Sequence, residues 1–379
     1  MRVALDVTPL AGARTGIGLF AAAMVEEFAD PDHRVELVGL AMTARGRDEI
    51  ATALHDAGAT LGRAAPARLL RAAWGRIDLP PVEWLTGPVD VVHGTNYVVP
   101  PARRAAQLVS VHDLSAWRDP EQVTPTSRAY PRLVERALAR GAHLHTISGF
   151  VADEIEADLG VSRDRIHTVH LAADTLPPAE PGAGLRQVAA DRPDDRRAVA
   201  ERFVLAVGSV EPRKDYPRLV AAFDAIATDR PDLALAIAGG PGWGSEALAD
   251  AIAASAHGER IRLLGHVTAE EKASLLHDAA VVVSSATYEG FGIVPLEAMA
   301  AGSPVVAVAG GSVPEVCADA AVLVPPSDND ALAAAMAAVL DDEAAAAGLV
   351  AAGRRRAERF SWASTARGLV DVYRSLVDP

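Results

Sequence analysis

The sequence predicts an α/β protein of two domains, each a parallel β-sheet covered by helices. Short apolar runs alternate with longer helical patterns along the whole chain, which is typical of parallel sheets with crossover helices. A proline- and glycine-rich stretch at residues 175–184 separates these runs into two groups. The length of 379 residues is also more than a single hydrophobic core usually serves.

The first domain is expected at residues 1–175. Each of its six apolar runs is interpreted as a strand; they are Val3–Val7, Val35–Leu40, Val89–Val92, Gln107–Val111, Leu144–Ile147 and Ile166–Leu171. Asp6 lies inside the first run, which therefore favours a strand over a signal peptide.

The second domain is expected at residues 201–360, after a linker and a charged, exposed helix at 176–200. Its predicted strands are Phe203–Val207, Leu233–Ala238, Ile261–Leu264, Ala280–Ser284, Pro304–Val308 and Ala321–Val324. Residues 361–379 form a last helix with its apolar positions on one face, so we expect it to pack back on the first domain.

Composition and charge disfavour several classes of protein. The formal net charge of −14 gives no basic footprint for nucleic acid, so no nucleic-acid partner is expected. Cys317 is the only cysteine, which excludes an internal disulfide and a cysteine zinc cluster. No apolar run approaches the ~18 residues of a membrane span. The expectation is a cytoplasmic protein.

The most informative segment is Tyr288–Glu297, with the sequence YEGFGIVPLE. Glu289 and Glu297 flank a glycine-rich loop that follows a predicted strand. Pro295 suits the first position of a helix, which would put Glu297 in the first helical turn. A helix start presents N–H groups to an anion, and carboxylates accept hydrogen bonds from hydroxyls. The segment therefore predicts a site for phosphate and polyol, as in a sugar nucleotide.

A second motif, Gly208–Lys214, follows the predicted strand at 203–207. Its adjacent cations, Arg213 and Lys214, suit a diphosphate, because arginine can bind it bidentately and lysine as a point charge. A solvated surface pair is the alternative interpretation. Lys214 and Lys272 are the only lysines of the chain, so a lysine at a strand end is unusual here.

Together these motifs resemble the retaining glycosyltransferases of family 4. The likeness rests on the Glu-x7-Glu loop, the earlier Glu-Pro-Arg-Lys segment, and the runs at 298–307 and 310–316, which cover most of residues 203–326. The family implies the GT-B fold, in which two Rossmann-like domains face each other across a cleft. It also implies a nucleotide diphosphate sugar as co-substrate, retention of the anomeric configuration, and no bound cofactor or catalytic metal.

Carried over residue by residue, Lys214 would hold the donor diphosphate with help from Arg213. Glu289 would contact the hydroxyls of the donor sugar, and Glu297 would accept those of the ribose. Without a side chain standing out as a general base, the resemblance implies that the leaving phosphate takes the acceptor proton.

The same resemblance implies that backbone amides near Gly292, Ile293 and Val294 cap the phosphates. Many members carry arginine directly after the strand glycine, where this chain has Ser209. Ser209 is still expected to lie next to the donor phosphates, and Arg213 is expected to replace the missing arginine.

In the first domain, Gly16 and Gly18 belong to a Gly-x-Gly-x-x-Ala run that formally fits a dinucleotide fingerprint. Eight residues separate this run from Val7, whereas the fingerprint needs a tight turn directly after the strand, so NAD binding is disfavoured. In the family, such a glycine loop lies over the donor phosphates and the acceptor site; a plain loop-to-helix connection is the alternative.

His112 follows the predicted strand at 107–111, and in the family a histidine at this position contacts the transferred sugar. Two further segments, His93–Tyr97 and Ser148–Gly149, also follow predicted strands. Each is interpreted either as a contact with the acceptor or as a turn former. The other histidines of these strands are interpreted as structural; they are His143, His145, His167 and His170.

The acceptor is left open between a glycan, a lipid-linked acceptor and a small molecule. Val-His-Asp-Leu at 111–114 and residues 208–214 resemble mannosyltransferase-like members, which favours GDP-mannose as donor, with UDP-glucose close behind. Rival interpretations are a sugar-nucleotide epimerase or hydrolase on the same fold, and a non-catalytic nucleotide-sugar-binding protein.

A basic and apolar segment in the first domain indicates a peripheral contact with anionic lipid or a lipid-linked acceptor. Its residues are Arg63, Arg68, Arg71, Arg76, Arg103 and Arg104, with Leu69, Leu70 and Trp74 beside them. A solvated helix is the alternative interpretation.

Overall fold

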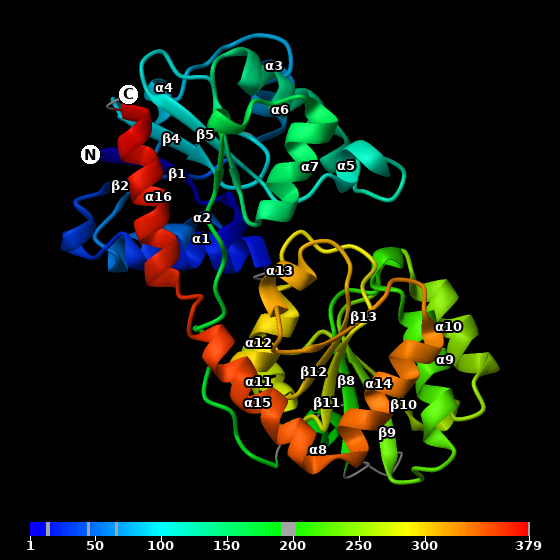
Figure 1. Cartoon of the computed structure of the whole chain (residues 1–379). Helices are drawn as coiled ribbons and strands as arrows, with labels where there is room; N and C mark the ends of the chain where they lie inside the picture. The colour runs from blue at the N-terminus through cyan, green and yellow to red at the C-terminus, as the bar shows by residue number, and fades with distance from the viewer. Residues whose placement is uncertain (13–15, 44–45, 65–66, 183, 191–201, 378–379) are drawn as a thin grey trace. The chain divides into compact units, whose positions relative to one another are not determined.

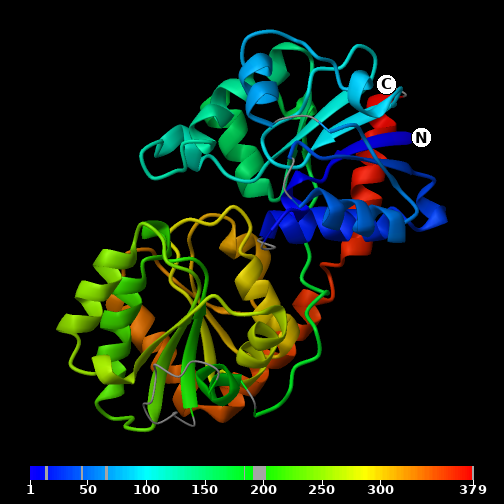
Figure 2. The same ribbon diagram turned by 180° about the vertical axis from the view of Figure 1, so that it is seen from behind.

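The computed structural model describes residues 1–12, 16–43, 46–64, 67–182, 184–190 and 202–377. The chain forms two compact units: unit 1 contains Met1–Leu171 and Trp362–Pro379, and unit 2 contains Ala172–Ser361. Figures 1 and 2 show that each unit is a β-sheet with helices on both faces. The α/β class is therefore confirmed, and every described strand pair is parallel.

Unit 1 has a seven-stranded sheet of order β3-β2-β1-β4-β5-β6-β7. Its strands are β1 Arg2–Asp6, β2 Glu36–Leu40, β3 Thr60–Leu61, β4 Val91–Gly94, β5 Ala106–Val111, β6 His143–Thr146 and β7 Ile166–Thr168. Its helices are α1 Gly16–Glu27, α2 Arg47–Asp56, α3 Ala67–Trp74, α4 Glu83–Thr86, α5 Ser115–Arg118, α6 Tyr130–Ala139, α7 Gly149–Leu159 and α16 Trp362–Val377.

Unit 2 has a six-stranded sheet of order β10-β9-β8-β11-β12-β13. Its strands are β8 Arg202–Val207, β9 Leu233–Ala238, β10 Ile261–Gly265, β11 Val281–Ser284, β12 Val305–Val308 and β13 Val322–Val324. Its helices are α8 Gly184–Ala190, α9 Tyr216–Ala227, α10 Ser245–Ala254, α11 Ala269–Asp278, α12 Ile293–Ala301, α13 Val313–Cys317, α14 Asn329–Asp341 and α15 Glu343–Ala357.

Each predicted apolar run overlaps one strand, with ends that differ by one or a few residues. Strand β3 was not predicted, because Thr60–Leu61 is too short to form an apolar run. Alternate residues of β8 enter the two cores of unit 2. Val204 packs on the side of α9 and α14, and Phe203 and Leu205 pack on the side of α8 and α11.

The last helix, α16, packs on α1, β4 and β5 within unit 1, and both ribbon views show it along this unit (Figures 1 and 2). Its apolar face is buried, with Trp362 2% and Tyr373 0% exposed. Phe20 of α1 lies 6.3 Å from the Trp362 ring. The burial of two aromatic rings explains why the end of the chain forms a stable helix here.

The predicted linker at 176–200 is partly built into unit 2. Residues 184–190 form α8, which packs against α11, and Leu185 and Val188 are buried in the core. The N–H groups of Gly182 and Gly184 donate to the two oxygens of Asp278, at 3.0 and 2.9 Å. Residues 191–200, where the rest of the predicted charged helix falls, lie outside the described residues.

Candidate active site

The two motifs of the second half follow neighbouring strands of unit 2. Residues 208–214 come directly after β8, and residues 285–292 connect β11 to α12. The strand order of unit 2 changes direction between β8 and β11. Ligands of open parallel sheets bind outside the carboxyl ends of the strands at such a switch point. The fold therefore brings both motifs to the position where a ligand is expected.

Gly208 lets a lysine side chain lie over the end of β8. Its φ of +142° lies in a region that side-chain-bearing residues rarely adopt. A Cβ atom at this position would lie 3.1 Å from Cε of Lys214 and 3.2 Å from the hydroxyl of Tyr216. That hydroxyl donates to the Gly208 carbonyl at 2.9 Å. The positive φ is thus the main reason for a glycine after the strand, and the missing Cβ also leaves room for the end of the Lys214 side chain.

Arg213 and Lys214 converge on one carboxylate, that of Glu289. Nζ of Lys214 donates to Oε1 of Glu289 at 2.5 Å, and Nη1 of Arg213 donates to Oε2 at 3.0 Å. Arg213 also pairs with Glu211 at 2.9 Å. Burial raises the pKa of Glu289, but attraction to Lys214 and Arg213 outweighs it and lowers the pKa below the usual range. Glu289 is therefore an ionised carboxylate held by two cations.

The backbone of this cluster is fixed by hydrogen bonds between its loops. The Ser285 hydroxyl donates to the Lys214 carbonyl at 2.6 Å, and the N–H of Thr287 donates to the Arg213 carbonyl at 2.8 Å. The N–H and hydroxyl of Ser312 both donate to the Glu289 carbonyl at 3.0 Å. The two motifs are thus joined through main-chain groups, so their side chains keep a fixed spacing.

A third loop, at Gly310–Gly311, packs directly against the Glu289 backbone. A Cβ atom at Gly311 would lie 2.2 Å from the Glu289 carbonyl oxygen, and one at Gly310 would lie 2.5 Å from that of Thr287. No side-chain carbon fits at these distances. The glycine pair at 310–311 therefore serves the same site as the Glu-x7-Glu loop.

Helix α12 begins two residues earlier than the sequence analysis predicted. It starts at Ile293, after Gly292 in a left-handed conformation with φ +88°, so Pro295 is the third helical residue. The first-turn N–H groups have no intrahelical partner, which is why proline is tolerated there. Glu297 consequently lies in the second turn, and its predicted place in the first turn is wrong. Ile293 and Val294 occupy the first two helical positions, where N–H groups can face an anion.

Glu297 is buried, at 4% exposure, and it pairs with a residue that the sequence analysis did not assign to the site. Nζ of Lys272, on α11, donates to Oε1 of Glu297 at 2.6 Å. Burial raises the pKa of Glu297, and Lys272 opposes part of this rise. Each of the two lysines of the chain therefore holds one carboxylate of the Glu-x7-Glu motif. Their rarity is the signal that would have revealed Lys272.

Ser209 is exposed at the surface of the loop after β8. Its carbonyl accepts a hydrogen bond from the N–H of Glu211 at 2.8 Å, which shapes the turn that leads to Arg213. The guanidinium of Arg213 also donates to the Tyr288 carbonyl at 3.3 Å. In this unit the structure thus brings together Lys214, Arg213 and Glu289, with Ser209 on the same loop as the cations.

In unit 1, Gly16 and Gly18 do not form a loop but the first turn of α1. Gly18 is buried, whereas a Cβ atom at Gly16 would meet no atom within 4 Å. A short 3₁₀ turn at Thr8–Leu10 separates β1 from this helix, and residues 13–15 lie outside the described residues. The expected glycine loop is therefore a helix start, and the spacing that disfavours a dinucleotide fingerprint is present in the structure.

His112 lies at the carboxyl end of β5 and is 7% exposed. Its Nε2 atom is 2.8 Å from the Thr95 carbonyl, which can only accept, so Nε2 carries the proton. The ring packs edge-on against Phe20 and Tyr97. Burial lowers the pKa of His112, against the opposite effects of Thr95 and Asp113. The ring is therefore neutral and keeps Nδ1 as an acceptor.

Asp6 is a second unusual group at this edge, and the sequence analysis treated it only as part of a strand. It is the last residue of β1 and is 2% exposed. Its Oδ1 atom accepts from the N–H and the hydroxyl of Thr8, at 2.9 and 2.5 Å. Burial raises the pKa of Asp6 to about 6, although these hydrogen bonds and Arg71 act in the opposite direction. A carboxylate that ends a strand at the sheet's switch point was the available signal.

His93 does not face a ligand, contrary to one of the two interpretations of the 93–97 segment. It is fully buried, with Nδ1 2.7 Å from the Tyr373 hydroxyl and Nε2 2.8 Å from the Ser110 hydroxyl. The Ser110 hydroxyl also lies 2.8 Å from Nδ1 of His145, and Nε2 of His145 lies 3.0 Å from the Val169 carbonyl oxygen. Ser148 is likewise buried and caps α7.

The Val169 carbonyl fixes which group donates and which accepts in each of these hydrogen bonds. The Val169 carbonyl can only accept, so His145 donates from Nε2 and accepts at Nδ1 from Ser110. His93 then donates to Ser110 and accepts from the Tyr373 hydroxyl. Burial lowers the pKa of His145 to about 3 and that of His93 well below its ordinary value. The two histidines are therefore neutral groups that attach α16 to the sheet.

The described part of the chain holds no cluster of three or more histidine, cysteine, aspartate or glutamate side chains suited to a metal ion. Among the described helices, none is both long and apolar enough to span a membrane.

Sequence comparisons assign both halves of the chain to one family. Residues 15–172 match the profile described as "Glycosyl transferase 4-like domain", and residues 188–356 match "Glycosyl transferases group 1". A D-inositol 3-phosphate glycosyltransferase of Saccharomonospora viridis is 30% identical over 311 residues, which are 77% of this chain and 68% of the relative. The chain belongs to the family 4 glycosyltransferases. It is therefore an enzyme of the transferase class, as the sequence motifs predicted.

Two further relatives are mannosyltransferases. The O-antigen chain mannosyltransferase B of Escherichia coli is 29% identical over 76% of this chain and 74% of its own length. The MMP alpha-(1->4)-mannosyltransferase of Mycolicibacterium hassiacum is 31% identical over 69% of this chain. The matched segment covers 60% of that relative.

Solved structures share the fold at lower identity. Sucrose-phosphate synthase from Thermosynechococcus elongatus superposes with a TM-score of 0.70 at 21% identity, covering 99% of both chains. HepE of Anabaena in complex with UDP-glucose gives 0.71 at 16% identity, again with 99% of both chains. These likenesses establish the GT-B architecture for this family member.

Proposed function

We propose that this glycosyltransferase moves a hexose, with mannose favoured, from a nucleotide diphosphate sugar to an acceptor hydroxyl with retention of anomeric configuration. The observation that carries the proposal is the cluster of Lys214, Arg213 and Glu289 at the switch point of unit 2. It combines two cations for a diphosphate with one carboxylate for sugar hydroxyls, next to the start of α12.

The proposed chemistry needs negative charge to develop on the departing diphosphate. Lys214 and Arg213 stabilise that charge, and the first-turn N–H groups of α12 add to it. Glu289 pairs with both cations, and Glu211 supplies a second carboxylate to Arg213, so the charges of the cluster balance within the protein. The donor then shares these cations, and Glu289 accepts from the hydroxyls of the transferred sugar.

The nucleoside end of the donor is assigned to Glu297. Lys272 keeps Oε1 of this carboxylate in place, and the buried position makes a hydrogen bond to a ribose hydroxyl strong. In unit 1, neutral His112 offers Nδ1 as an acceptor for a hydroxyl of the transferred sugar. These roles divide the donor among residues whose charges match its parts.

The proposed reaction does not require a side chain of the protein as a general base. The bond from the anomeric carbon to the diphosphate oxygen breaks as the acceptor oxygen attacks from the same face. The acceptor proton passes to the leaving diphosphate oxygen, and no metal ion is required. Activity should therefore persist in the presence of EDTA, and proton NMR of the first product formed should show the donor's anomeric configuration. Inversion would contradict the retaining mechanism.

The donor is proposed to be GDP-mannose. Support comes from the mannosyltransferase names of two relatives and from the motif likeness of residues 208–214. A thermal-shift screen of UDP, GDP, ADP and their sugars tests this assignment. We expect GDP and GDP-mannose to raise the Tm most. A larger shift with UDP would reassign the base, and no shift with any nucleotide would contradict the donor site.

Product analysis separates transfer from the two rival activities. With labelled donor and no acceptor, a transferase should release little sugar, whereas a hydrolase or epimerase would convert the donor. A protein that only binds the donor would give no product with any acceptor. Screening glycan, lipid-linked and small-molecule acceptors against the same labelled donor identifies the acceptor class.

A further inference from the structure

Four large hydrophobic side chains are exposed within one short segment of unit 1. Leu69 is 69% exposed, Ile77 54%, Leu79 48% and Trp84 53%. Only three other large hydrophobic side chains are exposed in the described part of the chain, so these four are concentrated instead of scattered. Exposed apolar side chains gathered in this way mark interaction surfaces.

The exposed apolar side chains differ from those predicted beside the arginines, apart from Leu69. Leu70 and Trp74 are 6% and 1% exposed and belong to the core of unit 1, so their expected contact with lipid is wrong. They fix the inner face of α3, which leaves Leu69 outside. The side chain of Arg68 lies outside the described residues.

Hydrogen bonds hold the loop between α3 and α4 in place. The indole N–H of Trp74 donates to the Pro80 carbonyl at 3.0 Å, and Arg136 donates to the Trp74 carbonyl at 2.8 Å. Arg136 and Arg140 of α6 also pair with Asp78, at 2.8 and 3.3 Å. Ile77 and Leu79 are thus presented to solvent by a fixed loop, whose one acidic residue is neutralised.

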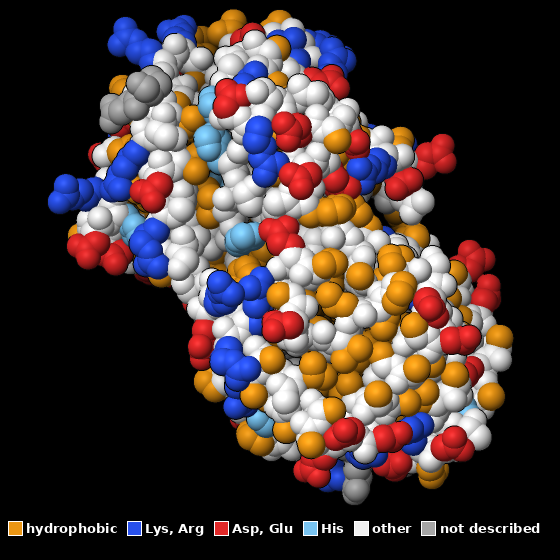
Figure 3. All heavy atoms as spheres, in the orientation of Figure 1, with side chains coloured by type: hydrophobic (Ala, Val, Ile, Leu, Met, Phe, Trp, Pro, Cys, Tyr) orange, Lys and Arg blue, Asp and Glu red, His pale blue; other side chains and the backbone are white. Residues whose placement is uncertain are grey.

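Exposed arginines surround these apolar side chains. Both Arg103 and Arg104 donate their backbone N–H groups to Oε1 of Glu83, at 2.8 and 3.1 Å. The guanidinium of Arg103 lies 5.5 Å from the centre of the Trp84 ring. Arg63 and Arg76 are exposed on the same segment. Figure 3 shows hydrophobic and basic side chains next to each other along the edge where Figure 1 places α3 and α4.

The charge of this segment is opposite to that of the whole protein. Residues 60–104 contain six arginines and three acidic residues, a net charge of +3, whereas the chain carries −14. Of the three acids, Asp78 pairs with arginines of α6, and Glu83 is occupied by backbone N–H groups. A local positive potential in an acidic protein favours an anionic partner.

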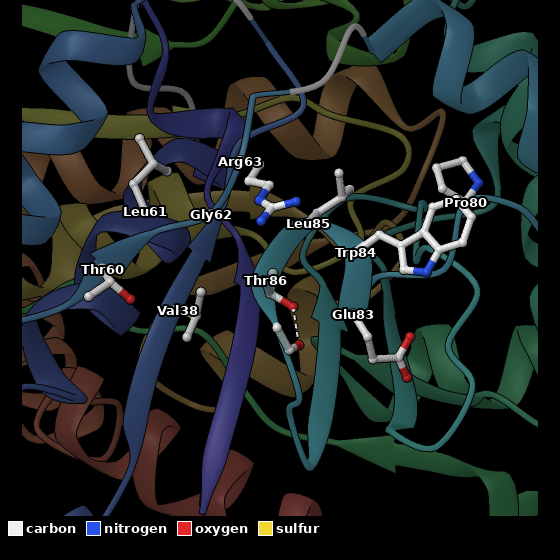
Figure 4. A pocket seen from close by; sticks show the side chains of 11 residues that line it. Val38, Thr60, Leu61, Gly62, Arg63, Pro80, Glu83, Trp84, Leu85 and Thr86 are labelled. Atoms are coloured by element: carbon white, nitrogen blue, oxygen red, sulfur yellow. Dashed lines mark hydrogen bonds between the residues drawn. The ribbon is translucent and has the colours of Figure 1, made fainter.

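A pocket of about 740 Å³ lies beside this surface, between β3 and α4. In Figure 4 the Arg63 side chain points into the pocket, and Glu83 and Trp84 project from α4 on its other side. The Glu83 carboxylate in the wall makes the pocket itself unsuited to an anion. The basic and apolar character therefore belongs to the outer surface.

We propose that unit 1 docks on an anionic phospholipid bilayer through this surface, defined by Leu69, Ile77, Leu79 and Trp84 with Arg76, Arg103 and Arg104. Tryptophan and leucine side chains enter the headgroup region, while arginines pair with lipid phosphates. A second copy of the chain is a poorer occupant, because a two-fold interface would place this basic surface against itself. The inference does not depend on the proposed donor or acceptor.

Vesicle sedimentation with the full-length protein tests the proposal without any sugar nucleotide. We expect binding to vesicles of equal parts phosphatidylcholine and phosphatidylglycerol, weakened by salt, and none to pure phosphatidylcholine. Equal binding to both lipids would contradict the role of the arginines. Absence of binding to the anionic vesicles at low salt would overturn the proposal.

The chain offers a matched control for the central side chain. Trp243 of unit 2 has the same exposed fraction as Trp84, 53%, and lies outside the proposed surface. Trp84→Ser should weaken vesicle binding about tenfold or more, whereas Trp243→Ser should leave it unchanged. Arg103→Ser with Arg104→Ser should cost roughly fivefold for each arginine. Thermal unfolding verifies that each variant is folded, and equal effects of the two tryptophan changes would refute the location.

Analytical ultracentrifugation distinguishes the other occupant. If the protein sediments as a dimer and Trp84→Ser makes it monomeric, the surface is an interface between two copies and the membrane proposal is wrong. A sedimentation coefficient that Trp84→Ser leaves unchanged, together with loss of vesicle binding, supports the bilayer.

Discussion

Unit 1 and unit 2 carry polar groups next to the same reversal of strand order, but the groups differ in charge. In both sheets the order reverses after the first three strands, between β1 and β4 in unit 1 and between β8 and β11 in unit 2. At this point unit 2 carries the ion-paired groups Lys214, Arg213 and Glu289. Close to the corresponding point, unit 1 carries Asp6 at the end of β1, whose burial raises its pKa to about 6, and neutral His112 at the end of β5.

The proposed roles of the two units account for this difference. A diphosphate brings negative charge that a preorganised cationic site stabilises as it leaves. The hydroxyl of the transferred sugar that is assigned to His112 is uncharged and needs a neutral hydrogen-bond acceptor. The fold supplies similar loop positions twice, and the residue types at those positions decide which part of the proposed donor each unit suits.

Lys214→Ala should give the largest loss, because it removes the cation that lies directly over the end of β8. We expect kcat to fall about 100- to 1000-fold, the range for loss of one group that stabilises developing charge. Initial rates with saturating donor measure the effect. Arg355→Ala, an exposed arginine on α15, is the control and should keep the wild-type rate. A loss of tenfold or less in a folded Lys214→Ala protein would reject the phosphate role.

Tyr373→Phe tests the neutral network of unit 1 apart from catalysis. The change leaves Nδ1 of buried His93 without its donor, which should lower the free energy of unfolding by about 1–3 kcal/mol. Urea unfolding at pH 7.5 measures this value. Arg374→Ala, on the exposed face of the same helix, should change it by no more than about 0.5 kcal/mol. Equal effects of the two changes would contradict the network.

The same histidines set a pH dependence with a definite sign. Their pKa is lowered in the folded protein, so below about pH 6.5 the unfolded chain binds protons that the folded one does not. As the pH falls below this value, the free energy of unfolding should decrease by about 1.4 kcal/mol per pH unit for each of His93 and His145. Asp6 and Glu297 act oppositely, because their pKa values are raised, whereas His112 adds to the fall because its pKa is lowered, so the three buried histidines set the sign of the net change. Stability that stays constant from pH 7.5 to 5 would contradict buried neutral histidines.

The fold and the donor motifs were predictable because they depend on short sequence patterns. Apolar runs located all strands but β3, and glycines near two carboxylates indicated the loop before α12. The start of that helix was misplaced at Pro295, since proline is accepted anywhere in the first turn and Gly292 sets the true beginning.

Partners distant in sequence were not predictable in the same way. Lys272 lies on another helix from Glu297, and only the packing of α11 on α12 makes them neighbours. His93 was open to two interpretations because its fate depends on Tyr373, 280 residues away. The sequence also could not separate Leu69 from Leu70, which point to opposite sides of α3.

Lys272→Met sharpens the comparison at the ribose end of unit 2. Lys272 opposes the rise in the pKa of Glu297, so its loss should raise that pKa further and weaken nucleotide binding about tenfold at pH 7. In both proteins affinity should fall as pH falls, because the carboxylate becomes protonated, and the fall should begin at higher pH in the variant. Calorimetric titration with GDP measures this. Lys272→Arg keeps the charge and should retain most of the affinity; identical pH profiles for Met and wild type would reject the coupling.

Ser209→Arg should have the smallest effect and asks whether Arg213 replaces the arginine that many family members carry after the strand glycine. Ser209 is exposed, so an added guanidinium should strengthen GDP binding only two- to fivefold. The informative experiment combines Ser209→Arg with Arg213→Ala in one protein. Arg213→Ala alone should weaken binding about tenfold, and if both positions serve the same phosphates, Ser209→Arg should restore more affinity in that background than in the wild type. Strictly additive effects would mean that Arg213 acts mainly by holding Glu289 in place, and unit 2 would then depend on Lys214 alone for its phosphate charge.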